Sequence, residues 1–235
     1  MTWAFSRALS GVALIATTVL PVTLPADAQT QQQLDWCSGK ARATPDLQSD
    51  GCTAVIESGK YSGAFLAAIF LSRGNAYDDK GDYDRAIADY NEAIRLDPKN
   101  SAAFFNRGLT SAKKKDYDGA IANYSAAIQL NRKDPDAFYN RGIAYDDKSD
   151  YIRAIADYNE AIRLNPKNPA AFLSRGNAYY DKGDYDGAIA DYNEAIRLDP
   201  KNSAAFFNRG LTSAKKKDYD GAIANYSAAI QCPSA

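Results

Sequence analysis

The chain repeats itself over long stretches. Residues 86–129 recur letter for letter as residues 188–231, an offset of 102 residues, which is three times 34. At the shorter period five blocks align without a gap, beginning at Ala67, Ser101, Pro135, Pro169 and Ser203. A tandem array repeats one packing unit, whereas a catalytic centre needs one unique set of residues. The period therefore predicts an array of small modules.

The same residue types return at fixed places in every block. The fourth place is Phe, the eighth is Gly, and the twentieth, twenty-fourth and twenty-seventh are Ala, Tyr and Ala. In the first block these are Phe70, Gly74, Ala86, Tyr90 and Ala93. A mid-helix Gly costs about 1 kcal/mol relative to Ala. Its return in each block indicates that two helix backbones approach closely there, with Phe and Tyr filling the flanks.

Each block contains two helical patterns. In the first block they cover roughly residues 68–80 and 84–96, with the turn signal Gly81-Asp82 between them. The second pattern ends at Asp97-Pro98, because proline disfavours helical geometry in the residue before it. The sequence thus predicts an all-α fold made of five helix hairpins.

This arrangement of large and small residues resembles the tetratricopeptide repeat, whose period is 34. The resemblance implies a right-handed α-solenoid of five repeats over 67–235, divided as 67–100, 101–134, 135–168, 169–202 and 203–235. The seventh place departs from the family pattern, with Arg where Leu is usual. We expect these arginines to pair with the residue sixteen places later, which is Asp89, Asp157 or Asp191 in three repeats and Asn123 or Asn225 in the others.

The N-terminus has a different composition. Residues 1–28 have one basic residue, Arg7, then an apolar run over 9–20 and the small-residue site Ala26-Asp27-Ala28. This layout is typical of a secretory signal peptide, so we expect cleavage after Ala28 and a periplasmic or secreted mature protein. The run is short for a membrane span of about 20 residues. The alternative, an uncleaved anchor, is less favoured, and no stable membrane span is expected after cleavage.

The segment 29–66 precedes the repeats and contains two of the three cysteines, Cys37 and Cys52. An oxidising compartment permits a disulfide between them, which would contribute about 3 kcal/mol for so short a loop; the alternative is two free thiols. Cys52 and Ile56 lie 34 residues before Ala86 and Tyr90, so the segment resembles the second half of a degenerate repeat. Cys232 has no evident partner.

Composition argues against catalysis. The chain has no His, which removes the commonest general base and metal ligand. The acid pairs 78–79 and 146–147 fall at helix ends in repeated modules, where no unique water-excluded cavity is expected. With 28 basic and 29 acidic residues there is no nucleic-acid footprint. We expect no enzyme activity, no cofactor and no metal site.

The family resemblance implies binding of another protein or peptide along a concave groove lined by the first helix of each repeat. The fifth places form an apolar stripe, Leu71, Phe105, Tyr139, Leu173 and Phe207. Beside it lie Asn75, Asn106, Leu109, Asn140, Ile143, Asn177 and Asn208. The alternative is that the stripe aromatics only pack in the core.

One known specificity is absent. Family members that clamp the acidic tails of cytosolic chaperones have basic residues where this chain has Leu71, Asp136 and Asn140. Two functions therefore remain: a periplasmic scaffold that binds a partner segment in its groove, and a self-associating structural protein that stacks end to end as a homo-oligomer.

Overall fold

The computed structural model describes residues 26–40 and 42–232. Over these residues it is all helical, and its elements are α1 (Ala26–Cys37), α2 (Pro45–Glu57), α3 (Gly63–Asp79), α4 (Tyr83–Leu96), α5 (Ser101–Lys113), α6 (Tyr117–Leu130), α7 (Pro135–Asp147), α8 (Tyr151–Leu164), α9 (Pro169–Lys182), α10 (Tyr185–Leu198), α11 (Ser203–Lys215) and α12 (Tyr219–Gln231). The all-α solenoid expected from the sequence is confirmed.

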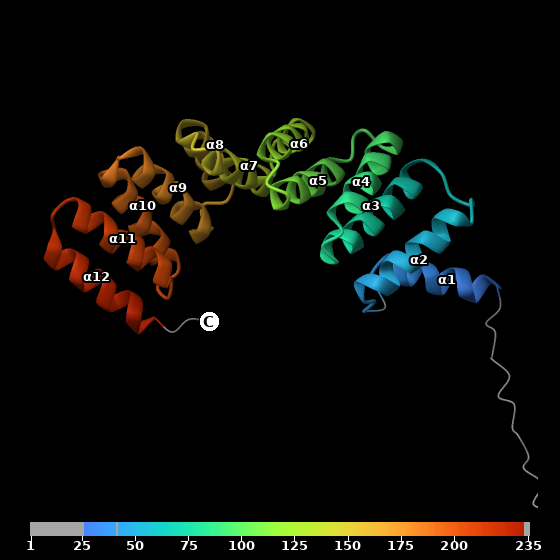
Figure 1. Cartoon of the computed structure of the whole chain (residues 1–235), viewed down its shortest axis with the longest axis horizontal. Coiled ribbons are helices and arrows are strands. Elements are labelled where there is room, and N and C mark those ends of the chain that lie inside the picture. The colour runs from blue at the N-terminus through green and yellow to red at the C-terminus, as the bar shows by residue number, and fades with distance from the viewer. Residues whose placement is uncertain (1–25, 41, 233–235) are drawn as a thin grey trace, which may run out of the picture.

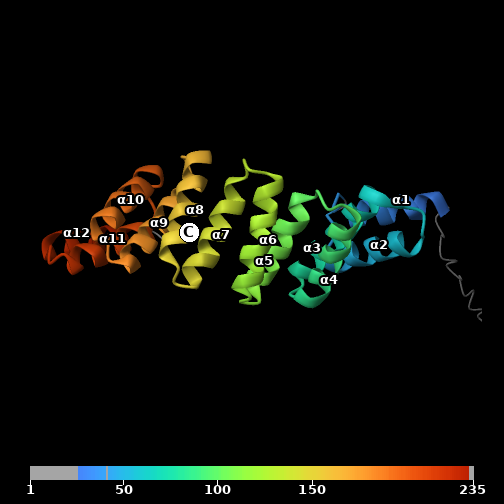
Figure 2. The same ribbon diagram turned by 90° about the horizontal axis from the view of Figure 1, so that it is seen from above.

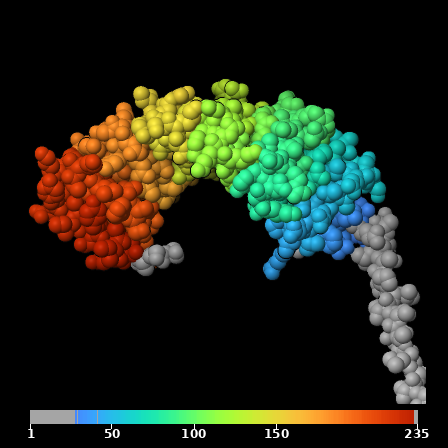
Figure 3. Space-filling view, viewed as in Figure 1, coloured from blue at the N-terminus to red at the C-terminus, as the bar shows by residue number. Residues whose placement is uncertain are grey.

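The helices pair into hairpins that stack along one axis (Figures 1 and 2). Each odd-numbered helix packs on the even-numbered helix after it, and each hairpin packs on the next. From α3 onward, consecutive odd-numbered helices also touch, while consecutive even-numbered helices of the described chain do not. In a curved array the inner elements lie closer together, so the odd-numbered helices form the inner side of the arch (Figure 3).

The eighth-place glycines make room for a tyrosine ring rather than for a second backbone. A Cβ added at Gly142 would lie 2.7 Å from Cε1 of Tyr158, and the same relation holds in all five hairpins. Tyr158 itself is 1% exposed. The expected approach of two helix backbones at this place is therefore wrong: the glycine makes room for the tyrosine ring of the second helix.

The turn inside each hairpin needs a left-handed residue. In two hairpins it is glycine, Gly81 and Gly183, with φ of 76° and 87°. In the other three it is Lys115, Ser149 and Lys217, with φ of 62°, 59° and 66°. An aspartate follows at once and caps the second helix, as Asp150 does by accepting from the Arg153 backbone N–H at 3.1 Å.

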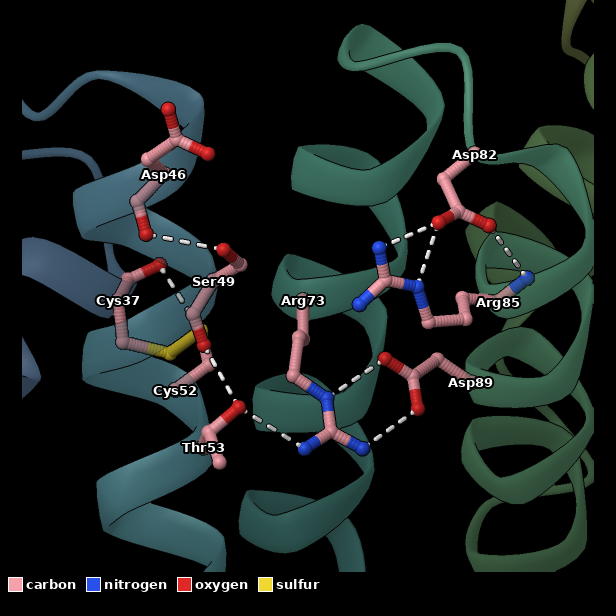
Figure 4. Close-up of polar contacts among 9 residues, drawn as sticks. All are labelled: Cys37, Asp46, Ser49, Cys52, Thr53, Arg73, Asp82, Arg85 and Asp89. Carbon is pink, nitrogen blue, oxygen red and sulfur yellow. Dashed lines mark hydrogen bonds and ion pairs between the residues drawn. A yellow bond between two sulfur atoms is a disulfide. The ribbon is translucent and has the colours of Figure 1, made fainter.

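The N-terminal segment differs from our expectation of half a repeat. Helix α1 packs on α2, so residues 26–57 form a complete hairpin. The predicted disulfide is confirmed: Cys37 and Cys52 are bonded, with their Cα atoms 4.6 Å apart (Figure 4). A Cβ at Gly51 would lie 2.8 Å from the Gln33 carbonyl oxygen, so α1 and α2 approach closely beside the bond.

The register of α2 also differs. Arg73 Nη1 donates to Thr53 Oγ1 at 3.1 Å, twenty residues back, whereas Arg107 Nη1 donates to Asn91, sixteen residues back. By this contact α2 lies about one helical turn out of the register that the 34-residue spacing predicts. Helix α3 likewise begins at Gly63, four residues before the block boundary at Ala67.

Most of the expected signal peptide, residues 1–28, lies outside the described residues; Ala28 itself is in the first turn of α1. Within 26–40 and 42–232 none of the helices is both long and apolar enough to cross a bilayer.

Candidate binding groove

The seventh-place arginines join the two helices of each repeat by hydrogen bonds. Arg73 donates to both carboxylate oxygens of Asp89, from Nε at 2.7 Å and Nη2 at 2.8 Å (Figure 4). Arg141 and Arg175 pair in the same way with Asp157 and Asp191. In the other two hairpins, Arg107 and Arg209 donate from Nε to Asn123 and Asn225. The pairing predicted from the sequence is confirmed.

The fifth-place stripe lies on the inner helices and is only partly buried. Phe105 packs on Tyr124 with ring centroids 5.7 Å apart, and Tyr139 packs on Tyr158 at 5.9 Å. Leu71, Phe105, Tyr139 and Leu173 are half-buried, and Phe207 is 49% exposed. The stripe therefore packs on the core tyrosines without being fully buried.

The groove asparagines are partly used inside the chain. Asn75 Oδ1 accepts from the Tyr90 hydroxyl at 3.0 Å and from Asn106 Nδ2 at 2.8 Å. Asn177 Oδ1 accepts in the same way from Tyr192 and Asn208. These amides link neighbouring hairpins, which sequence reasoning did not predict.

The middle of the groove lacks this link. There the ninth place is Ile143, which packs against the buried cluster that contains Tyr158 and Ala178. Asn140 Nδ2 donates to the Asp136 carbonyl oxygen within its own helix, at 2.8 Å. Leu109 packs similarly beside Tyr124. The asparagine link therefore starts from the first and fourth repeats, at Asn75 and Asn177, whereas the second and third repeats have the apolar Leu109 and Ile143 at that place.

Next to the link between Asn177 and Asn208 lies a cavity of about 270 Å³ that sequence reasoning missed. It is lined by Asp146, Asn177, Tyr180, Asp181, Tyr192, Asn208 and Leu211. Burial raises the pKa of the Asp146 carboxyl to about 6, and the neighbouring carboxylates of Asp181 and Asp147 add to the rise. Burial also raises the pKa of Tyr192, which keeps its hydroxyl protonated as a donor to Asn177. The sequence alone marks residues 146–147 only as an acid pair at a helix end.

Comparison with known families agrees with this architecture. Residues 71–138 match a model described as tetratricopeptide repeat, and residues 147–183 and 176–217 match one described as TPR repeat. Together these matches cover more than half of the chain. The chain belongs to the tetratricopeptide repeat family. Neither matched family model describes an enzyme.

Solved structures of other tetratricopeptide repeat proteins have the same fold. A crystal structure of MamA is 27% identical, covers 67% of this chain and 92% of its own, and has a TM-score of 0.65. YrrB, described as a TPR protein with an unusual peptide-binding site, is 24% identical over 78% of this chain and 93% of its own, with a TM-score of 0.66.

A tetratricopeptide repeat protein from Parabacteroides merdae aligns over more of the chain. It is 17% identical, covers 89% of this chain and 82% of its own, and has a TM-score of 0.75, which shows a shared fold. Among curated proteins none matches this tetratricopeptide repeat chain.

Proposed function

We propose that this protein is a non-catalytic scaffold of the periplasm that binds an extended segment or a helix of a partner protein in its concave groove. The observation that carries the proposal is the fifth-place stripe. Its side chains recur once per hairpin on the inner helices, and Leu71, Phe105, Tyr139 and Leu173 are only half-buried there. A row of partly buried aromatic and aliphatic groups at regular spacing suits a partner with regularly spaced apolar side chains. In YrrB, the same fold carries a peptide-binding site.

Export is supported by two features. Residues 1–28 have the pattern of a secretory signal peptide, and the bonded pair Cys37–Cys52 suits an oxidising compartment. Cell fractionation followed by N-terminal sequencing tests this part. A mature N-terminus at Gln29 in the periplasmic fraction is the expected result, and full-length protein in the cytosol would contradict it.

The groove is tested by site-specific photocrosslinking in the full chain. A benzophenone side chain at Leu173, on the inner helix α9, should capture the partner in periplasmic extract. The same group at Ala156, exposed on the outer helix α8, is the matched control and should not. Phe105→Ala should weaken binding of the captured partner by about 1 to 3 kcal/mol without changing helical content. Capture of the partner from Ala156 but not from Leu173 would place the binding site on the outer, even-numbered helices.

Self-association is the second candidate, and the exposed end face of α12, where a following hairpin would pack, favours it. Ile128 on α6 is 9% exposed because α7 covers it, whereas its counterpart Ile230 on α12 is 84% exposed. Ile223 is 64% exposed beside it. Sedimentation of the full chain at several concentrations tests this candidate. A mass that rises with concentration, and that Ile230→Lys returns to the monomer, would support stacking through this face; a constant monomer mass would exclude it.

A further inference from the structure

Where α3 packs on α5, a carboxylate at the helix contact has both a hydroxyl and an ammonium partner. Asp78 near the end of α3 holds the twelfth place of the first repeat. Its Oδ1 accepts from the Thr110 hydroxyl at 2.7 Å, and its Oδ2 is 2.5 Å from the Lys113 ammonium. Both partners come from α5, the inner helix of the next hairpin. The carboxylate is therefore neutralised and hydrogen-bonded within the chain.

Asp146 holds the same place in the third repeat, and its partners are missing. At the positions of the hydroxyl and the ammonium, α9 has Ala178 and Asp181. Among the described residues, no donor lies within hydrogen-bonding distance of Asp146 Oδ1, although that oxygen is fully buried. A buried carboxylate oxygen without a donor is costly, and a second carboxylate in place of a lysine adds repulsion.

Asp181, which holds the place of Lys113 in its repeat, lines the cavity together with Asp146. The cavity walls supply two carboxylates, from Asp146 and Asp181, and the ring of Tyr180. Within the described chain, no lysine or arginine lines it. An ammonium group is attracted both to carboxylates and to the face of an aromatic ring. Its lining comes from α7, α9, α10 and α11, three of which are inner helices, so it opens beside the stripe of the groove.

We propose that this cavity is a specificity pocket for a lysine side chain of the bound partner segment, whose ammonium takes the place at Asp146 that Lys113 takes at Asp78. The inference rests on the proposed function, since it assumes that the partner lies along the inner helices. It adds the chemistry of the partner: a segment with a lysine among its apolar side chains. Apolar side chains are disfavoured there because they would leave Asp146 without a donor, and a neutral hydroxyl would not offset the repulsion between Asp146 and Asp181.

The simplest probe is n-butylammonium chloride, which reproduces the end of a lysine side chain. The full chain, labelled with ¹³C in its carboxyl groups, is titrated with n-butylammonium and, separately, with 1-butanol at equal ionic strength. The Asp146 carboxyl signal should shift saturably with the amine only, while the paired carboxyl of Asp78 stays in place. The titration midpoint of Asp146 should also fall when the amine is present, because the bound cation favours the ionised form. The titratable groups that face Asp146 are Asp147, Asp181 and Tyr158.

Two variants complete the test. Asp146→Asn should lose at least about tenfold in affinity for the amine. The double variant with Ala178→Thr and Asp181→Lys copies the arrangement at Asp78, so its own lysine should occupy the pocket and abolish binding. Equal shifts with amine and butanol, or unchanged amine binding in both variants, would overturn the pocket. Such a failure leaves the groove standing if Leu173 still crosslinks the partner, whereas amine binding with capture only from Ala156 would refute the groove instead.

Discussion

Arg141 and Asp157 form a two-pronged ion pair between the two helices of the third hairpin. Nε and Nη2 of the arginine each lie 2.7 Å from a carboxylate oxygen, and Nη1 donates to Ser125 Oγ on α6 at 3.0 Å. The side chains are 19% and 8% exposed. One guanidinium therefore joins three helices, α6, α7 and α8. Where the family pattern has leucine, each of the five repeats has an arginine that pairs with an aspartate or asparagine of the second helix.

Removing the arginine should destabilise the array strongly. In Arg141→Met the apolar stem remains, but the Asp157 carboxylate is left mostly buried without its partner. We expect a loss of about 2 to 3 kcal/mol, at the low end for broken buried pairs because the site is partly solvated. Urea denaturation followed by circular dichroism and fitted with a nearest-neighbour repeat model measures it.

The chain supplies two controls for that variant. Asp157→Asn copies the natural Arg107–Asn123 pair and should cost less than Arg141→Met. Arg163→Met removes an exposed pair with Glu160 and should change stability by less than about 0.5 kcal/mol. Equal losses in all three variants would show that the Arg141–Asp157 pair has no special role.

The glycine at the eighth place should not tolerate a methyl group. Gly142→Ala gains about 1 kcal/mol of helix propensity, but the new Cβ would lie 2.7 Å from the Tyr158 ring, which is buried and cannot move aside. We expect a net loss of about 2 kcal/mol. Gly187→Ala is the matched control, because the first and third repeats have Arg85 and Arg153 at that place. A thermal melt in which Gly142→Ala is as stable as the parent would contradict the packing.

Glycine at a left-handed turn residue should stabilise the protein. Ser149 has a φ of 59°, whereas Gly81 and Gly183 hold the equivalent place in other hairpins. Ser149→Gly removes the strain of a side chain in this region but gives the unfolded chain more freedom, so we expect a net gain of up to about 1 kcal/mol. The melting temperature reports the gain, and a lower value than the parent would rule it out.

The carboxyl of Asp146 should make stability depend on pH. Its folded-state pKa is raised to about 6, so folding favours the protonated form. This contribution is fully present below the unfolded pKa, near 4, and is lost as the pH rises through about 6. Asp146→Asn should therefore stabilise the protein above pH 6, by on the order of 1 kcal/mol after discounting for partial solvation, and change little at pH 4. Denaturation of both proteins across this range measures the difference.

Asp78→Asn is the control for that comparison. It removes the acceptor of the Lys113 ion pair, so it should not stabilise the protein at any pH. A gain at high pH equal to that of Asp146→Asn would show that the unpaired state of Asp146 is not the cause.

Reduction of the Cys37–Cys52 bond should loosen the α1–α2 hairpin alone. The bond closes a short loop, so its loss should lower the stability of α1 and α2 by about 3 kcal/mol. Trp36 lies on α1 beside the bond, and its Cβ would be 2.9 Å from a Cβ at Gly51. Dithiothreitol should therefore change tryptophan fluorescence while most of the helical circular dichroism remains. Loss of the whole helical signal on reduction would contradict this.

The sequence by itself determined the repeated unit. The period of 34 predicted the five hairpins from α3 to α12, because each fixed place supplies the same contact in every copy. The spacing of sixteen between Arg141 and Asp157 was enough to predict their pairing, since both lie within one hairpin. The disulfide followed from two cysteines in a short segment. All of these relations are local, or repeat a local relation.

Only the tertiary structure decided the contacts between hairpins and at the N-terminal end. Helix α1 has a polar sequence without the block pattern, so its packing on α2 was not predictable from periodicity. Two features depend on which residues of neighbouring repeats face each other. They are the hydrogen bond between Asn106 and Asn75 and the unpaired Oδ1 of Asp146. The unpaired Asp146 could have been found in the sequence by comparing the twelfth place of each repeat with the tenth and thirteenth places of the next repeat. These places contact one another only because neighbouring inner helices pack side by side. The effect of a substitution in one repeat therefore depends on the residue that the next repeat places against it.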